Sequence, residues 1–112
     1  MAYDEALAQR IRELVARQRG LSEKKMFGGL AFLISGNMAI AASGQGGILV
    51  RVDPDQSDTL VRTTKATVAV MQGRNMPGWL RVASEDVRTT PQLRKWVTLG
   101  TEFANSLPAK MK

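Results

Sequence analysis

The stretch KKMFGGLAFLISGNMAIAASGQGGILVRV, residues Lys24–Val52, mixes alternating apolar residues with six glycines. Segments 30–34, 38–41 and 48–52 show the period-two alternation and the β-branched or aromatic enrichment that are typical of strands. Gly36–Asn37 separates the first two segments, and both residue types accept the positive φ angles of a tight hairpin turn. The stretch therefore predicts a meander of three antiparallel strands.

The glycines of this stretch raise a second question, because clustered glycines either hold a phosphate or turn the chain. Gly44 and Gly46 match the start of a dinucleotide-binding Gly-x-Gly-x-x-Gly motif, but Leu49 occupies the third position and a strand follows. We therefore expect them to turn strands. Gly28–Gly29 precedes a strand and indicates a bulge or a close backbone approach. Residues 23–27 can add a short edge strand before it.

The remaining segments predict helices and further strands on both sides of the meander. They are helices over residues 4–18 and 53–64 with N-caps at Asp4 and Asp53, strands over 67–71 and 79–82 joined by a turn at 72–78, and a helix from Thr90 onward. Gly100 interrupts this last helix, which indicates close packing there. We expect an α+β fold of helix, three strands, helix, two strands and helix, in which the helices pack on one mainly antiparallel sheet. Residues 1–108 would form the single domain and 109–112 a frayed tail.

The composition excludes several kinds of chemistry. The 112 residues include no cysteine and no histidine, which excludes a disulfide framework, a thiolate metal site, a cysteine nucleophile and a histidine base. No apolar run approaches the ~20 residues of a membrane span, and the acidic N-terminus is unlike a basic signal peptide. We expect a cytoplasmic protein without membrane association, cofactor, bound metal or catalytic residues. An enzyme would instead need a pocket with convergent polar groups.

The net charge of +6 and the isoelectric point near 10.3 allow two interpretations. Dispersed basic residues keep a protein soluble, whereas a basic surface binds nucleic acid. The candidate nucleic-acid contacts are Lys24, Lys25, Arg51, Arg81, Arg94 and Lys95.

The predicted strands carry apolar residues on both faces. Phe32, Ile34 and Met38 share one parity, and Leu33, Ala41 and Leu49 share the other. Either helices cover both faces, or the second face binds a protein or a second copy of the chain. Leu33, Ala41 and Leu49 are the candidate partner face.

The segments MAYDEALAQRIRELV, EKKMFGGLAFLISGNMAIAAS, GILVRV, MPGW and LRKWVTLGTEFANSLP together resemble the TfoX/Sxy N-terminal domain family. The resemblance covers about Tyr3–Pro108. Its most specific part is Met26, Phe27, Gly28 and Gly29, followed by Phe32 and the hairpin at 36–38.

This resemblance implies the same order of helices and strands that the residues predict. The best-known members activate natural-competence genes together with the cyclic-AMP receptor protein, and they carry a second, C-terminal domain that we expect this chain to lack. The resemblance supplies no catalytic residues, and we expect its signature positions to be structural. We therefore expect a non-catalytic regulatory or protein-interaction module with a protein partner or a homodimer. The alternative is a nucleic-acid-binding accessory protein.

Overall fold

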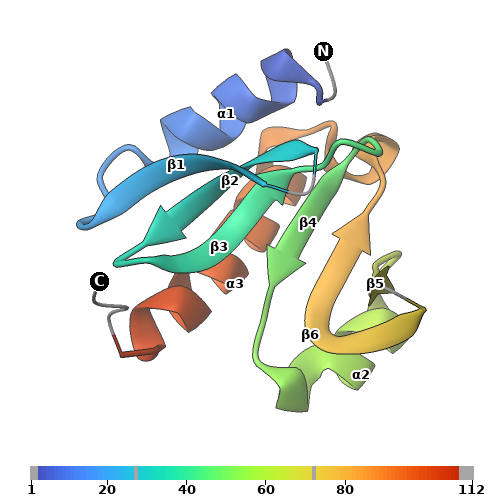
Figure 1. The fold of residues 1–112 in the computed structure, drawn as a ribbon. Coiled ribbons are helices and arrows are strands. Elements are labelled where there is room, and N and C mark those ends of the chain that lie inside the picture. Colours follow the sequence, from blue (N-terminus) through green and yellow to red (C-terminus); the bar gives the residue numbers. More distant parts are fainter. Residues whose placement is uncertain (1–2, 27, 72, 109–112) are drawn as a thin grey trace.

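A six-stranded antiparallel sheet carries the helices on one of its faces (Figure 1). The structure is a computed structural model that describes residues 3–26, 28–71 and 73–108. Its elements in chain order are α1 (Glu5–Val15), β1 (Leu21–Met26), β2 (Gly29–Ile34), β3 (Asn37–Ala42), β4 (Ile48–Arg51), α2 (Pro54–Thr63), β5 (Thr67–Met71), β6 (Arg74–Val82), the 3₁₀ helix η1 (Ser84–Val87) and α3 (Thr90–Ser106). The predicted α+β class is confirmed. The predicted tail at 109–112 lies outside the described residues.

The strand order is β1-β2-β3-β4-β6-β5, and β2, β3 and β4 form the predicted meander. The segment before the double glycine forms a full strand, β1, which pairs with β2 from Leu21 to Met26. β6 pairs with β4 on one side and with β5 on the other, so β5 lies at the edge of the sheet opposite β1. The sheet therefore ends in β1 on one side and β5 on the other.

The hairpin between β2 and β3 turns one residue earlier than predicted. Ser35 and Gly36 form the two-residue loop, with φ angles of 52° and 83°, and Asn37 is already the first residue of β3. The Asn37 side chain is buried and its Nδ2 donates a hydrogen bond to the carbonyl oxygen of Pro108 at 2.9 Å. Asn37 therefore anchors the segment that follows α3 and does not turn the chain.

A bulge in β3 reverses the predicted orientation of Met38. Phe32 pairs with Ile40, but the next residue, Leu33, pairs with Met38, so Ala39 has no partner in this ladder. An extra residue shifts the side-chain alternation by one position. Met38 therefore shares a face with Leu33, and the prediction that it lies with Phe32 was wrong.

The turn predicted at residues 72–78 is largely strand. β6 begins at Arg74 and continues through Pro77, while its pairing with β5 shifts between Val68 and Ala69. A bulge of this kind accommodates proline because the residue leaves the hydrogen-bond ladder. Gln72, the first residue of the predicted turn, lies outside the described residues.

Each α-helix begins at a capping side chain. The Asp4 carboxylate accepts a hydrogen bond from the Leu7 backbone N–H at 3.1 Å, as predicted, and Asp53 accepts from the N–H of Asp55 at 2.9 Å. α3 begins with a capping box between Thr89 and Gln92. Among the described residues, no helix has the length and apolar content of a membrane span.

The main core lies between the helices and one face of the sheet. It includes Leu7, Ile11 and Val15 of α1, Leu93, Trp96, Val97 and Ala104 of α3, and strand residues such as Phe32, Ile40, Val50 and Leu80. In Figure 1, α3 passes behind β3 and β4, and contacts between α3 and both strands agree with this view. Leu60 and Val61 of α2 pack at the border of the same core.

α3 approaches the sheet closely because Gly100 has no side chain. A Cβ atom built on Gly100 would clash with the carbonyl oxygen of Ala39 and lie 3.0 Å from Cγ2 of Val50. The packing predicted from the sequence at Gly100 is therefore present. Glycine costs helix stability here, but it allows the helix axis to approach the strands.

One ion pair connects α1 to the edge strand β1. Nε of Arg12 donates to Oε2 of Glu23 at 2.7 Å, and Nη2 donates to Oε1 at 2.9 Å. The hydrogen bonds from Arg12 hold the pKa of the Glu23 carboxyl below its ordinary value. Glu23 therefore faces the helices, and it stabilises the position of β1 only in its ionised form.

We expect Gly100→Ala to destabilise the protein although alanine is the better helix former. Helix propensity alone would add about 1 kcal/mol, whereas overpacking against a backbone carbonyl costs about 1–3 kcal/mol. Urea unfolding should therefore show a net loss, while Thr98→Ala, on the exposed side of α3, should show none. A more stable Gly100→Ala protein would contradict the close approach.

The Arg12–Glu23 pair predicts a pH-dependent effect of Glu23→Gln. Because the pKa of Glu23 is lowered in the folded protein, its stabilisation is present above the carboxyl's ordinary pKa and is lost as the pH falls through the lowered value. The Tm of Glu23→Gln should lie below wild type at about pH 7 and converge with it near about pH 3. Glu102→Gln, on exposed α3 surface, is the control. A Tm difference between Glu23→Gln and wild type that persists unchanged at acidic pH would exclude stabilisation by the ionised Glu23 carboxylate.

Candidate interaction site

The face of the sheet opposite the helices carries a second apolar cluster. We call it the helix-free face, and it consists of Met26, Ala31, Leu33, Met38, Ala41, Leu49, Ala69 and Trp79, all of which lie in strands. The predicted partner-face residues Leu33, Ala41 and Leu49 therefore lie together. Among the described residues, the helices contribute nothing to this cluster.

The sheet curls over this face. In a flat sheet the two edge strands β1 and β5 would lie roughly 24 Å apart. Yet Met26 of β1 and Val70 of β5 line the same cavity of about 180 Å³. Curling also explains why Ala41 and Leu49 are only 4% and 5% exposed without a covering helix.

The cavity on this face is the sheet groove, lined by Met26, Gly29, Ala41, Ala42, Ser43, Gln45, Leu49, Val70 and Arg81. Met26, Leu49 and the alanines supply apolar walls, and Ser43, Gln45 and Arg81 supply a polar end. Val70 is 60% exposed and is the large apolar residue most open to solvent among the described residues. The groove therefore joins an apolar slot to a polar, cationic end.

A single cross-strand row explains how the groove forms. Lys24, Ala31, Ala41, Leu49 and Arg81 are consecutive partners across β1, β2, β3, β4 and β6. Directly paired residues present their side chains on the same face. The small Ala41 leaves a hollow beside Leu49 and Arg81, and Lys24 lies at the other end of the row.

The polar end of the groove is organised around Ser43. Nη2 of Arg81 donates to Ser43 Oγ at 3.1 Å, and the backbone N–H of Gln45 donates to the same oxygen at 3.1 Å. Ser43 Oγ thus accepts two hydrogen bonds, which directs its own O–H elsewhere. A guanidinium group has five N–H donors, and within the described residues Arg81 uses one side-chain hydrogen bond.

Acidic side chains are segregated away from this face. Glu23 pairs with Arg12 of α1 on the helix side. The other acidic residues lie in helices or at their N-caps: Asp4, Glu5, Glu13, Asp53, Asp55, Asp58, Glu85, Asp86 and Glu102. The helix-free face therefore presents Lys24 and Arg81 without a neighbouring carboxylate side chain.

Of the other predicted nucleic-acid contacts, Arg51 pairs with a residue of the helix-free face, Trp79, and the remaining three lie elsewhere. Lys25 pairs with Leu30 and so faces the helix side of β1. Arg51 lies at the end of β4 with its guanidinium 5.1 Å from the Trp79 ring centre and 5.5 Å from that of Phe103, an arrangement that fixes it by cation–π contact. Arg94 and Lys95 line a separate depression of about 480 Å³ on α2 and α3.

Two of the signature positions, Met26 and Gly29, line the groove. Met26 and Gly29 are partners across the turn between β1 and β2, and Gly28 has a φ of 75° in that turn. A Cβ on Gly29 would clash with the carbonyl oxygen of Ala42, so the expected close backbone approach is present. Phe27 lies outside the described residues.

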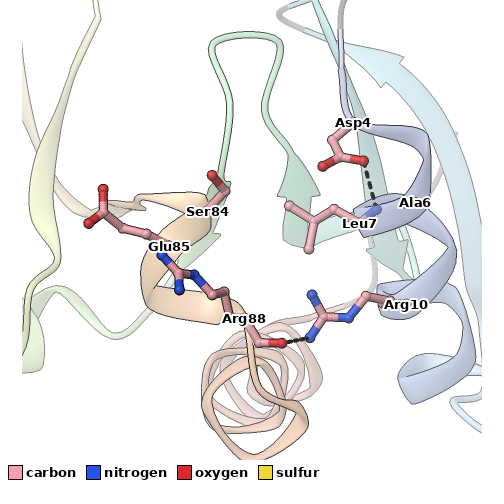
Figure 2. A pocket seen from close by; sticks show the side chains of 7 residues that line it. All are labelled: Asp4, Ala6, Leu7, Arg10, Ser84, Glu85 and Arg88. Carbon is pink, nitrogen blue, oxygen red and sulfur yellow. Dashed lines mark hydrogen bonds between the residues drawn. The ribbon is translucent and has the colours of Figure 1, made fainter.

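A second cavity, of about 330 Å³, lies between the start of α1 and η1 (Figure 2). Two of its charged side chains, Asp4 and Arg10, already have structural roles. Asp4 caps α1, and Nη2 of Arg10 donates to the carbonyl oxygen of Arg88 at 2.9 Å, which Figure 2 shows as a bridge between the two elements. We therefore place the candidate site in the sheet groove. No cluster of three metal-ligating side chains of the His, Cys, Asp and Glu types occurs in the described part of the chain.

Sequence reasoning missed several groove residues. Ser43 and Gln45 lie between the second and third predicted strands, Val70 lies in the strand predicted over 67–71, and none of the three is among the predicted site residues. Arg81 was named for its charge, but its place beside Leu49 depends on the β4–β6 pairing. The apolar-polar alternation of residues 79–82 is the one sequence feature that indicates the orientation of Arg81, because it places Arg81 on the opposite face of the strand from Leu80.

Comparison with known proteins supports a family assignment. The family model of the TfoX N-terminal domain matches residues 13–104, a range that contains every strand, α2, η1 and most of α3. A search of curated proteins found none that matches the chain. Because the family model covers most of the 112 residues, this chain belongs to the TfoX N-terminal domain family.

Proposed function

We propose that this chain is a non-catalytic, cytoplasmic regulatory module that binds another protein through its helix-free face. The observation that carries the proposal is the asymmetry of the sheet. α1, α2 and α3 pack toward one core, while a second apolar cluster remains on the opposite face. Contiguous apolar surface of this kind is typical of interaction sites.

The exposure pattern supports a binding surface. Met26, Leu33 and Trp79 are half-buried, and Val70 is largely exposed, although all four are large and apolar. A partner that covered them would remove this apolar area from water, which is favourable. The buried alanines would form the floor of the interface, and the larger residues its contact points.

The chemistry of the groove supports a binding role over a catalytic one. Its polar side chains are Ser43, Gln45 and Arg81. Arginine remains protonated, and neither serine nor glutamine acts as a base near neutral pH without an activating neighbour. These groups hold and orient an anion, and the groove supplies no side chain suited to accept a proton.

The distribution of charge favours a protein over a nucleic acid. A phosphate backbone is bound by adjacent cations along one track. Arg81 lines the groove and Lys24 and Arg51 lie on other strands of the helix-free face, whereas Arg94 and Lys95 belong to a depression on the helix side. The six basic candidates therefore do not form one continuous track.

Photo-crosslinking tests the proposed surface. A photo-reactive amino acid replaces either Leu33, on the helix-free face, or Thr98, on the exposed side of α3. After irradiation in an extract of cells that make the protein, we expect a crosslinked product from position 33 that protease degrades and nuclease leaves intact. Position 98 should give none. Circular dichroism checks that both proteins are folded.

Other outcomes would change the proposal in defined ways. A nuclease-sensitive product from position 33 would replace the protein partner by a nucleic acid. Equal products from positions 33 and 98 would show that the helix-free face has no special role. Irradiation without any product from position 33 would contradict binding through this face.

A further inference from the structure

We propose that the sheet groove binds the C-terminal residue of a partner polypeptide, with an aliphatic side chain in the apolar slot and the α-carboxylate on Arg81 and Ser43. This inference rests on the proposed function and specifies the chemistry of its partner. It follows from three features of the groove: its cationic end, its apolar walls and its small volume.

The cationic end fits a carboxylate. Arg81 presents a guanidinium whose geometry matches two carboxylate oxygens, and Ser43 Oγ already accepts hydrogen bonds from Arg81 and from the N–H of Gln45. The hydroxyl proton of Ser43 is therefore available as an additional donor. No acidic side chain shares this face, so an incoming anion meets attraction from Arg81 and Lys24 without repulsion.

The apolar slot adjoins these donors. Met26, Leu49 and Val70 line it, and Ala41 forms its floor. A ligand that places only an anion here would leave these walls exposed to water. The groove therefore suits a group that carries an aliphatic side chain and a negative charge close together.

The volume limits the ligand to about one residue. The groove encloses about 180 Å³, below the roughly 300 Å³ at which sites for drug-sized ligands begin. An internal acidic segment would bring a carboxylate on one residue and an aliphatic group on another. The terminal residue of a chain carries both on the same Cα atom, and this compact arrangement fits the space.

NMR titration tests the site with defined probes. The probes are acetyl-alanyl-alanyl-leucine as the free acid, the same peptide as its C-terminal amide, and N-acetyl-leucine. We expect the free acid to shift the methyl signals of Met26, Leu49 and Val70, and the amide to bind at least about tenfold more weakly because it loses charge-assisted hydrogen bonds. The free tripeptide should bind more tightly than N-acetyl-leucine, because its two alanines lie outside the groove and add contacts to the helix-free face.

Three variants test whether the free-acid peptide binds in the sheet groove. Arg81→Gln should weaken binding of the free acid about tenfold to a hundredfold and bring it to the level of the amide. Ala41→Leu fills the floor of the groove and should abolish binding while leaving Arg81 in place. Arg94→Gln removes an equal charge from the helix side and should leave the affinity unchanged. The amide spectrum of each variant establishes that it is folded.

Each contrary result overturns a specific part of the inference. Equal binding of acid and amide would exclude the carboxylate contact, and equal binding of N-acetyl-leucine and the tripeptide would assign the groove to a free small acid. Absence of any shift up to ~10 mM peptide would exclude the site altogether. If crosslinking at position 33 persisted in that case, the proposed function would stand and only this inference would fail.

Discussion

The close approach of α3 to the sheet at Gly100 is the constraint on which the rest of the structure depends. Because Gly100 has no Cβ atom, the helix reaches the backbone of Ala39 and the side chain of Val50. This contact concentrates the main core on one side, where α1 also packs. The opposite side of the sheet receives no helix from the described chain, and its apolar cluster is shielded only by the curl of the sheet and by its own half-buried side chains.

The helix-free face combines two properties that the helix side lacks. It is hollow at Ala41, which is small, and the two ends of the cross-strand row through Ala41 are the cationic residues Lys24 and Arg81. The acidic residues that balance much of the protein's charge lie on helices, at their caps, or at Glu23 facing α1. Hydrophobic and electrostatic attraction for a partner therefore coincide in one place.

Local pattern predicted most of this fold, and long-range pairing determined the remainder. The alternation in 30–52 identified the meander, and it placed Leu33 and Leu49 on one face. The same alternation misplaced Met38, because a bulge is a one-residue shift that single-sequence periodicity does not register. The groove itself required the β4–β6 pairing and the curl of the sheet, which bring together side chains that are distant in sequence.

The most direct test of the account is a comparison of methyl signals from the two sides of the protein in an extract of cells that produce it. We expect the signals of Met26, Leu33 and Leu49 to broaden or shift when the labelled protein enters the extract, while those of Leu60 and Leu99 on the helix side stay sharp. Selective changes at Leu60 and Leu99 instead, or uniform changes on both sides, would contradict the helix-free face as the interaction surface.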